Sequence, residues 1–272
     1  MSITKRLEEA RRAFRQRDGQ AAAMVHSPEA IAGAYQRRHA ERHGAASHQY
    51  IGDLVYGGLD GIITTFAVVS GVAGAELGTH VVLILGLANL FADGFSMATG
   101  AYLSSKSEQE YYENELAREQ WEIEHFPEGE RLELYHLYLQ QGYTEEDAHK
   151  LVEIKTKNPR TWLHSMMVEE LGLLPDERKP LLSALATLAA FVTAGSLPLL
   201  VYLAGMVIPV PPHLSFPVSL ALSALALFGL GAAKVYVTGQ NPLRSGLEML
   251  IVGGLAAGVA YAVGALLKGL GT

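Results

Sequence analysis

The sequence predicts an all-α membrane protein with five transmembrane helices and a helical, polar insert between the second and the third. Charge falls in blocks: residues 51–103 and 181–267 hold almost none, whereas residues 1–50 and 104–180 are highly charged. The apolar blocks divide into stretches long enough to cross a hydrocarbon core of roughly 30 Å. One large globular core would not separate its charges in this way, so we expect membrane spans joined to a solvated insert.

Composition narrows the chemistry that is available. The 272 residues include 28 acidic and 21 basic side chains, and none is cysteine. Disulfides, thiolate metal sites and cysteine nucleophiles are therefore excluded. The net charge of −7 comes mostly from the glutamate-rich segment 104–180. We expect no nucleic-acid partner for such an acidic chain.

Hydropathy predicts the five spans, and basic residues predict their orientation. Glycine and alanine are abundant in the spans, so we expect close helix contacts. Lys and Arg collect on one side, which the positive-inside rule places in the cytoplasm. The N-terminus and the insert are then cytoplasmic and the C-terminus is outside. No vacuolar sorting signal is present, which favours a prokaryotic plasma membrane. The expected spans are 54–75, 81–104, 181–208, 216–237 and 243–267.

The chain divides into four expected regions. The first is basic and contains histidines. Its segment Ile3–Arg17 could form an amphipathic helix on a membrane surface, with Leu7, Ala10 and Phe14 on one stripe, or could stay a solvated tail. His39, His43 and His48 could collect metal. The regions are residues 1–50 (the N-terminal segment), 51–104 (spans one and two), 105–178 (the metal-binding insert) and 179–268 (spans three to five).

The insert is expected to contain four helices. The first continues straight from span two, because no Gly or Pro interrupts it before Pro127. Thr144 and Asn158 carry N-cap signatures for the third and fourth helices. The expected ranges are Ser104–His125, Glu128–Gln141, Thr144–Lys157 and Pro159–Leu171.

Polar residues inside the first two spans are candidates for an ion pathway. Asp60 lies about two turns into span one, with Thr64 one turn further. Asn89, Asp93 and Met97 recur every four residues in span two and so share one stripe. Intramembrane ionisable residues are functional by default, although a packing role for Asp60 remains an alternative.

The two spans should present these residues to one ion. They run antiparallel, so Asp60 and Met97 should lie at similar depth in the cytoplasmic half. Oxygen ligands suit hard or borderline cations, and a thioether shifts the preference toward late first-row metals.

The insert holds a denser group of carboxylates, spread over three predicted helices. Carboxylates on facing helices of a bundle form di-metal sites in other proteins. An acidic face exposed to solvent is the alternative, because spacing alone does not show that the faces converge. The candidate ligands are Glu115, Glu119 and Glu122 on the first helix, Glu130 and Glu133 on the second, and Met166 and Glu170 on the fourth.

At these residues the sequence resembles the vacuolar iron transporter (VIT) family. The motifs cover roughly residues 50–268 in the right order, and the first 45 residues contribute nothing to the resemblance. The motifs are Asp60-Gly-Ile-Ile-Thr-Thr-Phe66, Gly86-Leu-Ala-Asn-Leu90, Ser96-Met-Ala-Thr-Gly-Ala-Tyr-Leu-Ser-Ser-Lys-Ser107, Arg118-Glu-Gln-Trp-Glu-Ile-Glu124 and Trp162-Leu-His-Ser-Met-Met-Val-Glu-Glu-Leu-Gly172.

The resemblance implies a homodimer in a lipid bilayer that exports Fe²⁺, often with Mn²⁺, from the cytosol against inward proton flow. It implies no permanently bound cofactor, although Zn²⁺ or Co²⁺ could occupy the same sites. By motif, Asp60 and Met97 correspond to the membrane translocation site. The residues that correspond to the metal ligands of the insert are Glu119, Glu122, Glu130, Glu133, Met166 and Glu170.

Two departures from the family pattern and two rival functions bear on this prediction. Thr64-Thr65 replaces the Val-Pro common in plant members, and Asn89 stands where plant members often carry Glu. One rival is a membrane-anchored, ferritin-like ferroxidase, whose sites use Glu-x-x-His pairs with a spacing such as that of Glu122 and His125. The other is a metal-sensing scaffold that transports nothing.

Overall fold

The computed structural model describes residues 3–36, 50–208, 210–235 and 241–268. They belong to two compact units that divide between Gly52 and Asp53. All regular secondary structure in the described residues is helical, and five helical segments are long and apolar enough to cross a membrane. The predicted fold class is confirmed.

The N-terminal unit contains three short helices, α1 (Ile3–Gln16), α2 (Gly19–Val25) and α3 (Pro28–Gln36). The side chain of Asp18 caps α2 by accepting from two backbone amides. Small buried side chains form its interior, among them Ala13, Val25 and Ala34. The first helix was one of the two alternatives that the sequence left open; α2 and α3 were not predicted, because short helices leave weak periodicity. The predicted histidine cluster, His39, His43 and His48, lies outside the described residues.

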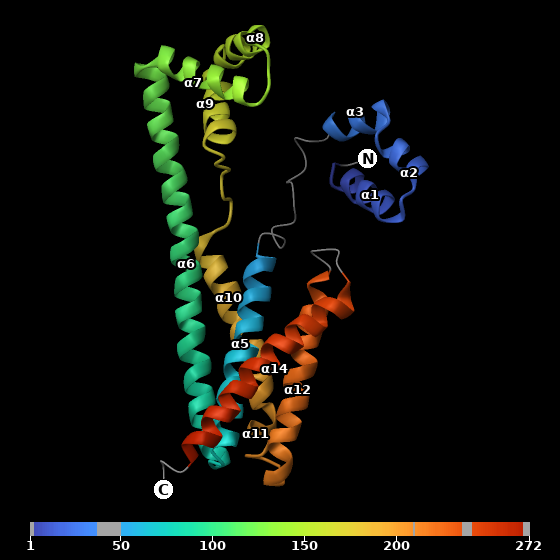
Figure 1. Cartoon of the computed structure of the whole chain (residues 1–272), viewed down its shortest axis with the longest axis vertical. Coiled ribbons are helices and arrows are strands. Elements are labelled where there is room, and N and C mark those ends of the chain that lie inside the picture. Colours follow the sequence, from blue (N-terminus) through green and yellow to red (C-terminus); the bar gives the residue numbers. More distant parts are fainter. Residues whose placement is uncertain (1–2, 37–49, 209, 236–240, 269–272) are drawn as a thin grey trace. The chain divides into compact units, whose positions relative to one another are not determined.

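The membrane-spanning segments follow the predicted order. Figure 1 shows them grouped around the lower half of α6, which continues far beyond the others. The segments are α5 (Ile51–Gly74), α6 (Thr79–His125), α10 with α11 (Pro180–Gly195 and Leu200–Ala204), α12 (Pro212–Ala233) and α14 (Pro242–Leu267).

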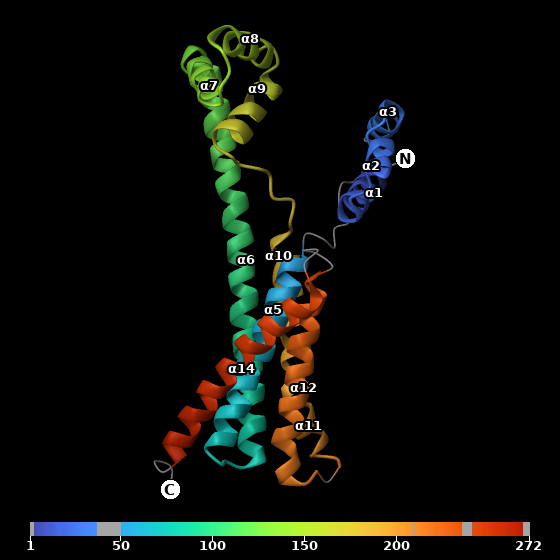
Figure 2. The same cartoon turned by 45° about the vertical axis from the view of Figure 1, so that its right-hand side comes forward.

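Helix α6 is one unbroken helix of 47 residues. At 1.5 Å per residue it is about 70 Å long, more than twice the roughly 30 Å of a hydrocarbon core. Its second half therefore projects out of the apolar layer, as predicted from the lack of Gly and Pro. Figures 1 and 2 both show α7, α8 and α9 gathered at its far end.

Glycines bring the spans into close contact, as predicted. A Cβ atom on Gly57 of α5 would lie 2.6 Å from the carbonyl oxygen of Thr187 in α10. A Cβ on Gly231 of α12 would lie 2.5 Å from the carbonyl oxygen of Ser245 in α14. These approaches are possible only without a side chain, and they fix how the spans pack.

Span three, predicted over 181–208, is present over Pro180–Ala204, but a break divides its helix. α10 ends at Gly195, a 3₁₀ turn, η3, follows over Leu197–Leu199, and α11 ends at Ala204. The cause is Pro198, which has no N–H to continue the helical ladder. The hydroxyl of Ser219 in α12 donates to the carbonyl of Pro198 at 2.6 Å, so the break is held from a neighbouring span.

Span four begins earlier than predicted. Helix α12 starts at Pro212, not at Phe216, and its regular part ends at Ala233. Pro212 occupies the first turn of the helix, where a missing N–H costs nothing.

The insert comprises α7 (Pro127–Gln140), α8 (Glu145–Thr156), α9 (Pro159–Ser165) and a π-helical segment, η2 (Met166–Glu170). Thr144 and Asn158 cap α8 and α9 through their side chains, as predicted. The fourth helix was expected to stay α-helical to Leu171, but its second half widens to a π-helix, a form found often at functional sites. The core of the insert is formed by Leu134, Tyr138, Ala148, Val152, Trp162 and Met166.

We predict that Gly57→Val destabilises the protein by about 1–3 kcal/mol, because the new side chain would overlap the backbone of α10. Circular dichroism during thermal unfolding in detergent measures this. Gly229→Ala is the matched control, because nothing lies within 4 Å of its Cβ position. Equal melting temperatures for Gly57→Val and the parental protein would contradict the packing.

Candidate metal centre

Three glutamates lie on one face of the projecting part of α6, because they are spaced three and four residues apart. They are Glu115, Glu119 and Glu122. The helix ends at His125, and Phe126 closes it by donating its N–H to the Glu122 carbonyl at 2.7 Å. Pro127 then begins α7, so the chain turns within a few residues and brings the acidic first turn of α7 close to the end of α6.

Three carboxylates lie close together at the turn between α6 and α7. One oxygen from each of Glu119, Glu122 and Glu130 lies within 4.8 Å of the others, a spacing that a single metal ion could bridge. Glu119 is 2% exposed and Glu130 is 4% exposed. Both have a buried oxygen, Oε2, with no hydrogen-bond partner among the described residues. Buried oxygens without a donor are costly, and a cation is what would satisfy them.

Two further predicted ligands approach the same cluster. Burial raises the pKa of Glu170 in η2 to about 7, and the nearby charge of Glu133 in α7 adds to the effect. Both also act electrostatically on Glu130. Five of the seven predicted ligands thus meet in one place.

The cluster contains more negative than positive charge, and this excess shifts the pKa values of its carboxyls. Burial raises the pKa of Glu130 to about 7, and the charges of Glu119 and Glu133 add to the effect. Burial also raises the pKa of Glu119, although the guanidinium of Arg118 offsets part of that rise. At neutral pH protons therefore occupy part of the site.

Arg118 is the residue that sequence analysis missed. Its guanidinium lies 2.7 Å from Glu115, 2.7 Å from Glu119 and 2.5 Å from Glu122. The signal was present, because an arginine three residues after one glutamate and four before another reaches both on a helix. Glu115, expected as a ligand, is bound to this arginine and stands outside the three-oxygen group.

Met166 is fully buried, and its surroundings are apolar. It packs in the core of the insert with residues such as Leu134 and Trp162. It also begins the π-helical segment that carries Glu170. The observed contacts therefore give Met166 a packing role, and ligation remains a prediction.

A second polar network fixes that π-helical segment. Glu169 accepts hydrogen bonds from Lys155 of α8, from Tyr138 of α7 at 3.0 Å and from Ser165 at 3.1 Å. Burial raises the pKa of Glu169, but the bonds from Lys155 and Tyr138 outweigh it and hold that pKa below its usual value. Glu169 therefore stays charged, and it anchors the segment from which the neighbouring Glu170 reaches the cluster.

Within the spans, the structure brings two predicted carboxylates together. Asp60 of α5 and Asp93 of α6 interact electrostatically, and both are partly buried. The Thr64 hydroxyl donates to the Asp60 carbonyl at 2.9 Å, so it is engaged within its own helix. The Nδ2 atom of Asn89 is buried and has no partner among the described residues. Met97 packs against an apolar cluster of the spans.

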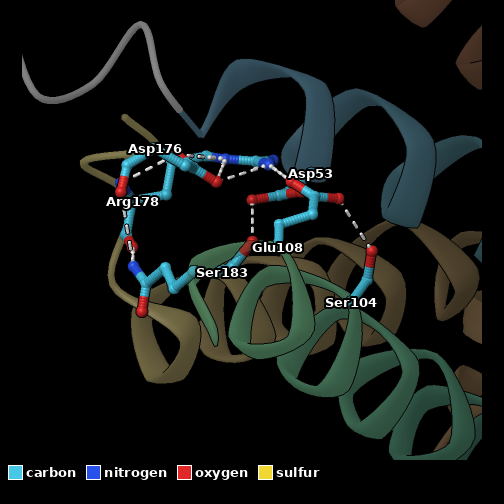
Figure 3. Close-up of polar contacts among 7 residues, drawn as sticks. Asp53, Ser104, Glu108, Asp176, Arg178 and Ser183 are labelled. Atoms are coloured by element: carbon cyan, nitrogen blue, oxygen red, sulfur yellow. Dashed lines mark hydrogen bonds and ion pairs between the residues drawn. The ribbon is translucent and has the colours of Figure 1, made fainter. Parts of the chain in front are cut away.

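A polar joint ties the return from the insert to the start of the spans (Figure 3). Arg178 bridges Glu108 of α6 at 2.9 Å and Asp176 at 2.8 Å. On the neighbouring helix α10, Ser183 donates to Asp53 of α5. Sequence analysis missed this joint, because its members come from three distant parts of the chain.

Together these features define a class of protein: a five-span helical membrane protein whose second span continues into an acidic insert with a carboxylate cluster that could hold a metal ion. Comparison with known proteins agrees with that class. The model of the VIT family matches residues 51–265, and the chain belongs to this family. It is accordingly an integral membrane protein related to metal-ion transporters, not to enzymes.

Relatives named as iron transporters match most of the chain. A vacuolar iron transporter of Toxoplasma gondii is 38% identical over 268 residues, which are 96% of this chain and 88% of the relative. Vacuolar iron transporter 1 of Arabidopsis thaliana is 37% identical over 226 residues, 82% of this chain and 88% of the relative. The first of these matches extends into residues 1–50, which carried none of the motifs.

We predict that metal binding to the insert tightens as pH rises toward 7 and then levels off. Below pH 7 a cation must displace protons from Glu130 and Glu170, whose pKa values burial raises to about 7, so the affinity should rise at least about tenfold per pH unit. Isothermal titration with Mn²⁺ from pH 5.5 to 8 measures this. Glu130→Gln should flatten the profile, and the exposed control Glu124→Gln should not. A flat profile for the parental protein would contradict the prediction.

Proposed function

We propose that the chain transports Fe²⁺, and also Mn²⁺, out of the cytosol in exchange for protons. The observation that carries this proposal is the continuity of α6. One rigid helix holds Asp93 and Met97 among the spans and Glu119 and Glu122 in the insert. Membership of a family with named iron transporters supports iron as cargo.

The insert is proposed to capture the ion before it reaches the membrane. Glu119, Glu122 and Glu130 supply the convergent oxygens, and Glu133 and Glu170 extend the site. The first three carboxylates come from the end of α6 and the start of α7, and solvent reaches part of the cluster. A bound ion can therefore leave as well as enter. A capture site of this kind raises the local metal concentration beside the spans.

The membrane part of the pathway is proposed to run along α5 and α6. Asp60 and Asp93 provide two carboxylates, Asn89 an amide and Met97 a thioether, and Thr64 lies one turn beyond Asp60. This donor set suits late first-row divalent ions better than Mg²⁺ or Ca²⁺. A carboxylate that alternates between a proton and a cation gives antiport a simple physical basis.

A homodimer is proposed because one chain by itself does not cover the carboxylates within its spans. Asp60 and Asp93 stay partly exposed on the surface of a single chain. Charged groups that face lipid are costly, and a second copy placed over them would remove that cost. The resemblance to the family independently implies a dimer.

We predict that Asp60→Ala lowers Fe²⁺ flux at least tenfold, because a carboxylate of the pathway is lost. Uptake into liposomes across an imposed pH gradient measures this, with Mn²⁺, Co²⁺ and Zn²⁺ as competitors. The exposed variant Glu153→Gln is the control. Unchanged flux in Asp60→Ala would refute the pathway, and flux that ignores the pH gradient would refute proton coupling. Iron-dependent oxygen consumption without flux would favour the ferroxidase instead.

We also predict that the insert and the loop after α5 lie on opposite sides of the membrane, with the insert in the cytoplasm. The chain has no cysteine, so single cysteines at Gly129 and Leu77 can be labelled selectively. A membrane-impermeant maleimide added to intact bacterial cells should label Leu77→Cys, and Gly129→Cys only after lysis. The reverse labelling pattern would show the opposite orientation.

The proposed dimer has a separate test: a monomeric mass in mild detergent would exclude it.

A further inference from the structure

Arg118 is placed differently from the other paired cations of the insert. Its guanidinium contacts three carboxylates at once, at 2.7 Å from Glu115, 2.7 Å from Glu119 and 2.5 Å from Glu122. By contrast, Lys150 pairs with Glu146 in an exposed bridge within one helix, a type that contributes little to stability.

Arg118 and a metal ion would need the same groups. Glu119 and Glu122 are two of the three residues whose oxygens lie within 4.8 Å of one another. A divalent ion bound there would sit beside the guanidinium, and like charges a few ångströms apart repel strongly where water is partly excluded. The two cations therefore compete.

The arginine satisfies the cluster only in part. It contacts Oε1 of Glu119, whereas Oε2 of Glu119 and Oε2 of Glu130 are buried and find no partner among the residues that the structure describes. One positive charge on the outer side leaves these inner oxygens unmatched. A divalent ion carries twice the charge and can reach them, so it has an advantage over the arginine.

Arg118 can leave without disturbing the fold. Its side chain is 44% exposed, and it reaches the cluster from the solvent side of α6. Its long side chain can rotate into water while the helix backbone stays in place.

We propose that Arg118 is a tethered counter-cation that occupies the metal-free cluster and is displaced by the incoming ion. This inference rests on the proposed function of the insert as a capture site. The tethered charge lowers equilibrium affinity and returns to the carboxylates when the ion leaves, which speeds release. A site on a transport route needs such a limit, because an ion held too tightly does not move on.

The test compares Arg118→Gln, which removes the charge, with Arg118→Lys, which keeps it. Equilibrium Mn²⁺ binding and chelator-triggered Mn²⁺ release are measured on the full-length protein in detergent. Arg118→Gln should bind Mn²⁺ at least about tenfold more tightly and release it more slowly, because repulsion between the two cations is removed. Arg118→Lys should stay near the parental values, and Lys150→Gln is the control for loss of a surface lysine.

Unchanged or weaker Mn²⁺ binding by Arg118→Gln overturns the proposal, because the arginine would then be a surface ion pair or an aid to ligand orientation. Adding Glu130→Gln to Arg118→Gln should remove the tight binding, which assigns it to the cluster. If Arg118→Gln does not fold by circular dichroism, Arg118→Met keeps the aliphatic stem and gives the same comparison. The capture site itself is wrong if the parental protein does not bind Mn²⁺, or if Glu119→Gln leaves that binding intact.

Discussion

Burial of carboxylates in surroundings that cannot solvate them is the constraint on which this structure depends. Such groups are costly unless a cation or a donor accompanies them. The chain accepts this cost in the insert, where Glu119 and Glu130 each keep a buried oxygen that has no partner in the described part of the chain. It also places Asp60 and Asp93 near enough within the spans to interact electrostatically. Both arrangements suit a protein whose cargo is a cation, because the bound cation would supply the positive charge that the carboxylates lack.

Helix α6 gives these two arrangements a common frame. Its 47 residues carry carboxylates of both groups, so the insert cannot turn independently of span two without bending the helix. The return path is fixed too, since Arg178 ties the segment before α10 to Glu108 of α6. The insert is thus attached to the spans at two places, by a continuous helix and by a polar joint.

Cations within the insert have two separate tasks. Lys155 binds Glu169 and holds the π-helical segment against α8, which is a structural role. Arg118 faces the acidic cluster itself from the solvent side. The difference follows from the neighbours, because Glu169 is satisfied by three donors while the cluster around Glu119 remains short of charge. A charge count alone would treat the two residues as equivalent.

The sequence by itself determined the features that depend on neighbours along the chain. Hydropathy located the five spans, the absence of Gly and Pro over Ser104–His125 predicted that α6 continues beyond span two, and Thr144 and Asn158 marked helix starts. Only the tertiary structure decided which side chains meet. The convergence of Glu119 with Glu130, the approach of Asp93 to Asp60 and the contact of Ser219 with Pro198 join residues from different helices. Periodicity gives the face of a helix on which a residue lies, but the packing of helices against one another decides what that face touches.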